Sequence, residues 1–243
     1  MHSQDALPLK AFYTTVSVPC PYLPDRTERK LAAEISGTDA QRWANVLSRA
    51  GFRRSHSVCY IPVCEECQAC RSVRIDVKGF HLNKKMKKTL RLNAELSFSI
   101  LPNVADSEQY ALFRNYLSAR HQGSEMNSMY FEEFRAMIED SPVETVLGQA
   151  RDTQTGALKG VMLTDVLDDG LSAVYSFFDS SEPFKSLGRY LILKLVEEAE
   201  KRGLPYVYLG YFISECPNMA YKAEYRPLEC CFGGKWREFI PLR

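Results

Sequence analysis

The sequence contains no run of apolar residues approaching the roughly 18 that a membrane-spanning helix needs. Its N-terminus also lacks a basic segment followed by an apolar one, so we expect no secretory signal. Neither sign of charge is in excess, since 30 acidic residues balance 31 basic ones. We therefore expect a cytoplasmic protein. Its eight cysteines are then expected to be metal ligands, reactive thiols or small buried groups rather than disulfides.

Four of the eight cysteines fall within twelve positions, at Cys59, Cys64, Cys67 and Cys70. The CxxCxxC spacing brings three thiols near one point, which suits metal binding, redox chemistry or a structural knot. A zinc ribbon needs two CxxC pairs, and Cys20 has no such partner. A metal site formed by Cys20, Cys64, Cys67 and Cys70 and a metal-free knot are equally compatible with the sequence. The remaining cysteines, Cys216, Cys230 and Cys231, are expected to be buried or incidental.

Residues 71–91 carry eight Lys or Arg and a single acid, Asp76, which gives this stretch a charge of +7. Because the chain as a whole is nearly neutral, the excess is local and predicts an anionic partner, with phosphate the best candidate. A solvated, lysine-rich helix is the alternative interpretation.

Apolar periodicity predicts a helix over 39–50, short strands over 58–62 and 73–77, a basic helix over 84–93 and a strand over 95–101. Helices over 106–121 and 130–139 follow, then strands over 144–150, 160–166 and 171–178, a helix over 186–202 and a strand over 206–211. The predicted fold class is α+β. It comprises a cysteine-rich N-terminal α/β region, residues 1–104, and an N-acetyltransferase-like (GNAT/Fem-type) mixed-sheet domain, residues 105–243.

In that acyltransferase fold, the turn from strand to helix presents free backbone N–H groups to an anion. Lys185, Gly188 and Tyr190 occupy this turn. Acetyl-CoA binding favours a second small residue where Tyr190 stands, because the pyrophosphate must approach the backbone closely. The sequence therefore supports the fold and disfavours acetyl-CoA as its ligand.

The chain resembles the bacterial aspartate/glutamate leucyltransferase family, relatives of the eukaryotic arginyl-tRNA–protein transferases. The likeness covers nearly the whole chain and is carried by Cys20-Pro-Tyr-Leu-Pro24, Gly51-Phe-Arg-Arg-Ser55, Tyr60-x-Pro62, Cys64-x-x-Cys67-x-Ala-Cys70, Arg74, Arg91-x-Asn93, Tyr116, Arg120-His121, Leu171-Ser-Ala-Val-Tyr-Ser-Phe-Phe-Asp179, Lys185-Ser-Leu-Gly188, Gly203-Leu-Pro-Tyr-Val-Tyr-Leu-Gly-Tyr211, Met219-x-Tyr-Lys222 and Pro227-Leu-Glu229. Cys59, Ile61, Lys185 and Arg189 are less usual for the family. A lysine at 185 keeps the charge but cannot form a bidentate fork, so tRNA contact there is expected to be looser.

The resemblance implies transfer of leucine from leucyl-tRNA to the N-terminal amine of proteins that begin with Asp or Glu, which marks them for degradation. No cofactor is required, because the donor ester is already activated. A zinc ion or an iron–sulfur cluster at the cysteines is implied only through the eukaryotic relatives. The implied partners are leucyl-tRNA and the acceptor proteins, and no membrane. The oligomeric state cannot be read from the sequence.

We expect the reacting centre where the strand ending at Asp179 meets the turn at 185–190. Asp179 is the candidate for removing or relaying the amine proton, and Tyr175 and Tyr211 (with Tyr208) would supply hydroxyl groups. The predicted acceptor-binding residues are Arg74, Lys222, Cys20, Cys67, Arg120 and His121. The predicted tRNA-binding residues are Lys84, Lys85, Lys87, Lys88, Arg91, Lys185, Gly188, Arg189 and Tyr190.

Three alternatives remain open from the sequence. An arginyltransferase with the same acceptors would need an acidic pocket for the donor side chain. A non-catalytic zinc-ribbon RNA-binding protein would use only residues 64–91. A small-molecule N-acetyltransferase is disfavoured by Tyr190.

Overall fold

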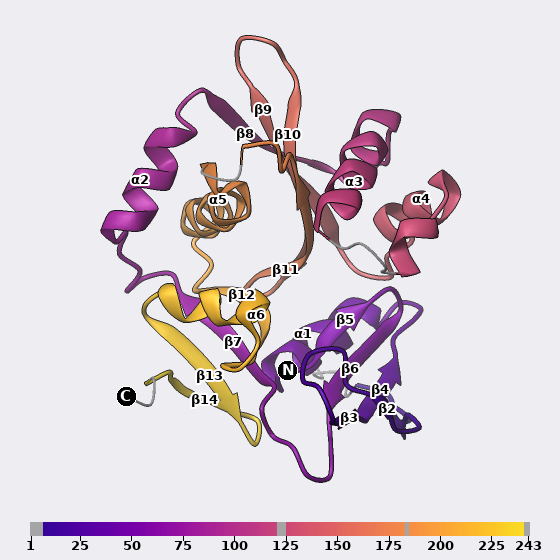
Figure 1. The fold of residues 1–243 in the computed structure, drawn as a ribbon. Helices are drawn as coiled ribbons and strands as arrows, with labels where there is room; N and C mark the ends of the chain where they lie inside the picture. The colour runs from indigo at the N-terminus through magenta and orange to yellow at the C-terminus, as the bar shows by residue number, and fades with distance from the viewer. Residues whose placement is uncertain (1–6, 121–124, 183–184, 241–243) are drawn as a thin grey trace, which may run out of the picture.

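The computed structural model describes residues 7–120, 125–182 and 185–240. Its centre is an eight-stranded sheet in the order β14-β13-β7-β12-β11-β10-β9-β8 (Figure 1). The strands are β7 (Arg71–Asp76), β8 (Leu96–Pro102), β9 (Thr145–Asp152), β10 (Leu158–Leu167), β11 (Gly170–Phe178), β12 (Tyr206–Phe212), β13 (Leu228–Phe232) and β14 (Lys235–Glu238).

The pair β11–β12 is parallel and the other neighbouring strands of this sheet are antiparallel. The parallel pairing ends at Ser172 opposite Tyr208, although β11 continues to Phe178 and β12 to Phe212. The register of β12 against β7 shifts at the same level, next to Gly210, whose φ is +76°. The two strands therefore separate after their first three residues. We call this separation the strand opening.

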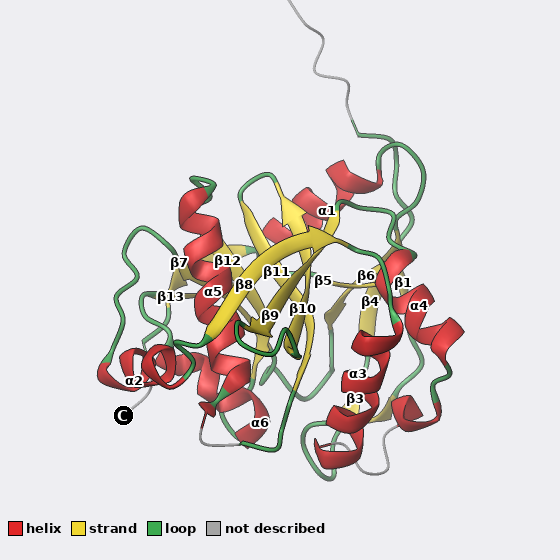
Figure 2. Cartoon of the chain, turned by 90° about the horizontal axis from the view of Figure 1, so that it is seen from above, coloured by secondary structure: helices red, strands yellow, loops and turns green. Residues whose placement is uncertain are grey.

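Helices cover both faces of the main sheet. Helix α5 (Leu187–Lys201) and helix α2 (Lys84–Leu92) lie on one face, and α3 (Ser107–Arg120) and α4 (Phe131–Glu139) lie on the other (Figures 1 and 2). The apolar residues of α5 that point to the sheet include Leu191, Leu195 and Ala199, all fully buried. Two hydrophobic cores, one on each face, hold the helices in place.

A smaller sheet is built by the N-terminal part of the chain in the order β1-β4-β6-β5. Its strands are β1 (Tyr13–Thr14), β4 (Lys30–Glu34), β5 (Arg53–Ser55) and β6 (Val58–Pro62), with helix α1 (Ala40–Arg49) alongside and a separate ribbon of β2 (Val18–Pro19) and β3 (Thr27–Glu28). A buried ion pair between Arg54 on β5 and Asp165 on β10 joins the two sheets.

The short remaining elements are the 3-10 helices η1 (Glu125–Ser128) and η3 (Tyr221–Glu224), and α6 (Pro217–Ala220). The cysteine loop, which we define as residues 63–70, runs from β6 into β7. Together with α6 it forms a small core around Leu23, Ile213 and Cys216.

The predicted mixed sheet of acyltransferase type, with antiparallel strands followed by a helix and a parallel strand, is confirmed. The strands and helices of the prediction appear with bounds shifted by up to two residues. The division into residues 1–104 and 105–243 stays a prediction, but the main sheet crosses it, because β7 and β8 come from the first of these segments. In the part of the chain that the structure describes, no helix has the length and apolarity to cross a bilayer.

Candidate active site

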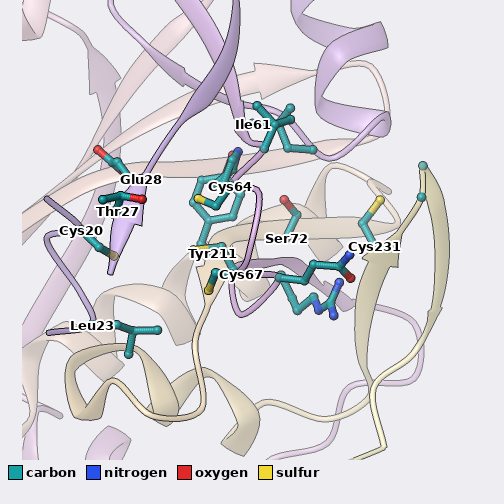
Figure 3. Close-up of a pocket in the computed structure, with 17 residues that line it drawn as sticks. Cys20, Leu23, Thr27, Glu28, Ile61, Cys64, Cys67, Ser72, Tyr211 and Cys231 are labelled. Atoms are coloured by element: carbon teal, nitrogen blue, oxygen red, sulfur yellow. The ribbon is translucent and has the colours of Figure 1, made fainter. Parts of the chain in front are cut away.

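A first cavity, of about 520 Å³, lies beside the cysteine loop (Figure 3). We call it the cysteine cavity. Its walls include Cys20, Cys64, Cys67 and Cys70, and the main sheet contributes Tyr211 of β12, Arg71 and Ser72 of β7 and Cys231 of β13. The predicted residues Cys20, Cys67 and Tyr211, which are far apart in the sequence, are thus brought together.

The four thiols of this cavity lie close enough to influence one another. Burial, and then the neighbouring Cys20, Cys64 and Cys67, raise the pKa of Cys70 to about 12. A thiol with such a pKa is protonated at neutral pH and is a poor nucleophile. No group of three or more His, Cys, Asp or Glu in residues 7–120, 125–182 and 185–240 is arranged to hold a metal ion. The thiols as arranged here do not fit a metal site, and metal binding stays a prediction.

A second cavity, of about 440 Å³, lies at the N-terminus of α5. We call it the helix cavity. Its lining combines the first turn of α5, the end of α3, the end of β11 and the start of α6: Tyr116, Arg120, Ser176, Phe178, Asp179, Ser180, Glu182, Ser186, Leu187, Gly188, Arg189, Ile192, Pro217, Asn218 and Tyr221. The first N–H groups of a helix have no partner inside it and carry partial positive charge, so this cavity favours an anion.

Gly188 is required at this turn because a side chain there would strike the ring of Phe178, with a Cβ at 2.9 Å from the ring edge. Arg189, which follows it, is ion-paired to Glu224 at 2.9 Å. Both residues line the helix cavity, and their tRNA-binding role stays a prediction. Arg120, predicted to bind the acceptor, lies in this cavity too, with its guanidinium 5.9 Å from the ring of Phe178.

Asp179 borders the helix cavity but is already engaged. Its carboxylate accepts hydrogen bonds from Lys159 at 2.8 Å and from the backbone of Ser181 at 2.9 Å. Burial alone would raise the pKa of Asp179, but these hydrogen bonds outweigh it and lower the pKa to about 2. A carboxylate this acidic accepts a proton poorly near neutral pH, which counts against the predicted role as a base.

The predicted tyrosines have different surroundings. Tyr211 lines the cysteine cavity and donates its hydroxyl to the carbonyl of Tyr60 at 2.8 Å. Tyr175 packs in the aromatic core against Phe113 and Phe177, and burial raises its pKa well above the ordinary value. Neither hydroxyl is acidic enough to exchange a proton easily, since burial also raises the pKa of Tyr211.

Lys222 and Arg74, both predicted to bind the acceptor, are buried in different places. Lys222, 8% exposed, donates its ammonium to the carbonyl of Tyr211 next to the cysteine cavity. Arg74 is bonded to Glu229 at 2.7 Å and to the hydroxyl of Tyr208 at 3.1 Å, and its guanidinium stacks on Tyr206. Arg74 is thus engaged by internal partners and lines neither cavity, which counts against its predicted role in acceptor binding. His121 lies outside the described residues.

Of the lysines predicted to bind tRNA, some are exposed on the surface and others are held in ion pairs. Lys84, Lys87 and Lys88 are exposed on α2, as is Arg91, whereas Lys85 pairs with Glu224 at 2.7 Å. Lys185 is held by Glu95 at 2.7 Å and Glu182 at 3.1 Å. The prediction for Tyr190 is wrong, because its ring is 1% exposed and packs in the core below α5, where it cannot meet a nucleic acid.

Sequence models of the N-terminal and C-terminal parts of arginine-tRNA-protein transferases match residues 18–88 and 108–232. The chain is 48% identical over 225 residues to an aspartate/glutamate leucyltransferase of Gluconacetobacter diazotrophicus, covering 93% of this chain and 86% of that protein. It is 46% identical over 240 residues to the protein of the same name from Paramagnetospirillum magneticum, covering 98% of each.

Among solved structures, the chain resembles the C-terminal domain of a putative lysylphosphatidylglycerol synthetase from Agrobacterium fabrum, with 15% identity and a TM-score of 0.47 over 74% of this chain and 53% of that one. It also resembles FemX, with 10% identity and a TM-score of 0.43 over 74% of this chain and 62% of that one.

Proposed function

Because the chain belongs to the arginine-tRNA-protein transferase family, we propose that it transfers leucine from leucyl-tRNA to the N-terminal amine of proteins that begin with Asp or Glu. The family makes the protein an aminoacyltransferase. The names of the relatives at 46–48% identity support leucine as the transferred residue and acidic acceptors.

One observation supports this proposal: a cavity suited to an anion and a cavity at the cysteine loop are linked through residues 211 and 221–222. Tyr221 lines the helix cavity and Tyr211 lines the cysteine cavity, while Lys222, adjacent to Tyr221 in sequence, bonds the backbone of Tyr211. A transferase needs one binding site for the donor and one for the acceptor, placed so that the two reacting groups can meet.

The donor end of the tRNA is assigned to the helix cavity. Its terminal phosphate would be held by the free N–H groups of Leu187, Gly188 and Arg189 at the start of α5. The exposed lysines of α2, which packs beside α5, would neutralise phosphates further along the acceptor stem. The acceptor peptide is assigned to the cysteine cavity.

The reaction exchanges an ester for an amide. The acceptor amine attacks the leucyl carbonyl, the tetrahedral intermediate expels the ribose oxygen of the terminal adenosine, and the amine proton passes to that oxygen. The ribose hydroxyl beside the ester provides a route for the proton that does not depend on Asp179. Positioning of the two substrates accounts for much of the rate, because holding reactants in register contributes about 7–11 kcal/mol in favourable cases.

The test is a transfer assay with the purified protein. Leucyl-tRNA and a peptide beginning with Asp are expected to give a peptide extended by leucine, detected by mass spectrometry. Arginyl-tRNA and a peptide beginning with Ala serve as the two control substrates and are expected to give at least tenfold less product. Absence of product with leucyl-tRNA and the Asp peptide would refute the proposal, and preference for arginyl-tRNA would reassign the donor.

A further inference from the structure

Arg53 of β5 reaches out of the small sheet into the strand opening of the main sheet. Its Nη2 donates to the carbonyl of Val174 on β11 at 3.2 Å. On the other side its guanidinium lies against Gly210 of β12, where the Cβ of any other residue would collide with it. The guanidinium thus fills the space between β11 and β12 just beyond the point at which their pairing ends.

The Nη1 atom of Arg53 is buried and has no hydrogen-bond partner. A buried donor left unpaired costs free energy, more so when it belongs to a charged group. The neighbouring Arg54 in the same strand is fully paired by comparison, because it donates two short hydrogen bonds to the buried carboxylate of Asp165. Arg53 has no equivalent acid.

Lys222 places a second cation beside the first. Its ammonium bonds the carbonyl of Tyr211, the residue after Gly210, so Arg53 and Lys222 contact consecutive residues of β12. Burial and the charge of Arg53 lower the pKa of Lys222 to about 7, and only the thiol of Cys216 acts in the opposite direction. Among the described residues, no acid forms an ion pair with either Arg53 or Lys222.

Residues of both cavities lie next to this pair of cations, since Lys222 bonds Tyr211 of the cysteine cavity and follows Tyr221 of the helix cavity in sequence. Arg53 acts electrostatically on Tyr211, which lines the cysteine cavity, and on Tyr221, which lines the helix cavity. An anionic group brought to this position would satisfy the unpaired Nη1 and relieve the repulsion between the two cations. The group that a transferase of this kind brings there is the side-chain carboxylate of an acidic acceptor.

We propose that Arg53 and Lys222 bind the side-chain carboxylate of the acceptor's first residue and thereby direct its N-terminal amine toward the helix cavity. The proposal rests on the transfer function above and assigns the residues that select the acceptor. Arginine and lysine would act together: the guanidinium donates from a fixed plane, and the ammonium adds a second charge.

The test uses four peptides that differ only in their first residue, Asp, Asn, Glu or Gln. With the unaltered protein, kcat/KM for leucyl transfer is expected to be at least tenfold higher for Asp than for Asn, and likewise for Glu than for Gln, because a hydrogen-bonded charge pair is lost in each amide. In R53Q, kcat/KM for the Asp peptide is expected to fall to near that of the Asn peptide. The Asn value should change by less than threefold, and R53K should recover part of the preference.

K222M provides an independent variant should R53Q be too unstable to purify, and it is expected to reduce the same preference. R135Q, which removes an exposed arginine from α4, is the matched control and should leave the Asp-to-Asn ratio unchanged. An equal proportional loss on the Asp and Asn peptides in both R53Q and K222M would overturn the proposal, because it would indicate a role in a step common to all acceptors. An unchanged ratio in both variants would overturn it as well.

A binding measurement without tRNA separates this proposal from the proposed function. Fluorescence anisotropy of labelled peptides should show tighter binding of the Asp peptide than the Asn peptide to the unaltered protein, and loss of the difference in R53Q. Selective binding of that kind without any leucyl transfer would refute the proposed function and keep the assignment of Arg53 and Lys222. Transfer to all four peptides with equal binding would refute the assignment and keep the transferase.

Discussion

At the scale of single residues, burying the amine of Lys222 beside the guanidinium of Arg53 is unfavourable, because both burial and the like charge destabilise its protonated form. Burial disfavours the charged form of Lys222, and its pKa falls from an ordinary value of 10.5 to about 7. Near neutral pH the folded protein therefore holds Lys222 partly neutral, and a bound carboxylate would restore its charge. Acceptor binding at this site should then be linked to proton uptake.

Lys222 also predicts a pH dependence of stability. Its pKa is about 7 in the folded protein and ordinary, 10.5, when unfolded, so between these values the unfolded chain binds the extra proton. This extra proton favours the unfolded state, and it becomes harder to bind as the pH rises. The free energy of unfolding should therefore rise from pH 7 to pH 9 by up to about 1.4 kcal/mol per pH unit. Below pH 7 both states are protonated and the contribution of Lys222 is constant.

Urea denaturation of the unaltered protein and of Lys222→Met, followed at pH 6, 7, 8 and 9, measures this effect. The difference between the two curves isolates Lys222 from the other groups that titrate. The difference should change with pH above 7 and stay flat below it. Parallel curves over the whole range would show that Lys222 keeps its ordinary pKa.

The sequence predicts some of the residues that the structure brings to the candidate site, and it gives no role to Arg53. Tyr211 and Gly188, which their sequence motifs predict as site residues, line the two cavities, and Lys222 bonds Tyr211, although their roles stay predictions. Arg53 was missed, because an arginine pair in a short strand gives no sign of which side chain will be paired internally. Alternation along β5 directs Arg54 toward Asp165 and Arg53 toward the strand opening, and only the sheet packing reveals which is which.

At the scale of elements, helix α2 combines a buried side with an exposed basic one. Met86 and Thr89 are buried, whereas Lys84, Lys87 and Lys88 are exposed. Asn83 caps the helix by accepting the N–H of Met86 at 2.9 Å. The helix is therefore held by packing that does not involve the lysines, and these can be changed without loss of structure.

Replacing Lys84, Lys87 and Lys88 together by Gln should weaken tRNA binding and reduce its dependence on salt. Each phosphate contact contributes about 0.7–0.9 to the slope of log affinity against log salt, so the slope should fall by roughly two to three. Filter binding at several salt concentrations measures it. Lys201→Gln with Arg202→Gln, at the far end of α5, is the control. Equal slopes in the triple variant and the unaltered protein would show that α2 is only a solvated surface.

Elements with strong periodicity were predicted well, and short ones were not. The helix over 187–201 and the strand over 170–178 carry long apolar patterns, whereas β1, β2, β3 and β5 have two or three residues each, too few for a pattern. For the hairpin of β13 and β14, the Gly233–Gly234 pair is the sequence feature that indicates a turn. Both glycines have the positive φ that a tight hairpin turn requires.

At the scale of the whole molecule, the main sheet draws its strands from both halves of the chain. β7 lies between β12 and β13, and β8 forms the edge next to β9. A fragment beginning at residue 105 would lack both strands, leaving the backbone of β12 unpaired along one side and exposing the core beneath α5.

We predict that a fragment of residues 105–243 will not fold by itself. A fragment of residues 71–243, which keeps all eight strands of the main sheet, is the matched comparison and should retain a cooperative thermal transition. Circular dichroism and size-exclusion chromatography distinguish the two. A sharp transition in the shorter fragment would instead support an autonomous domain from residue 105.

The cysteine loop ends directly in β7, a strand with hydrogen-bonded neighbours on both sides. One wall of the cysteine cavity is therefore continuous with the interior of the main sheet. This wall of the cavity has little conformational freedom to lose when a peptide binds, so the entropic penalty of binding should be small. A protein that must recognise many different chains by a single terminal residue gains from such a rigid receptor, because most of the affinity has to come from very few contacts.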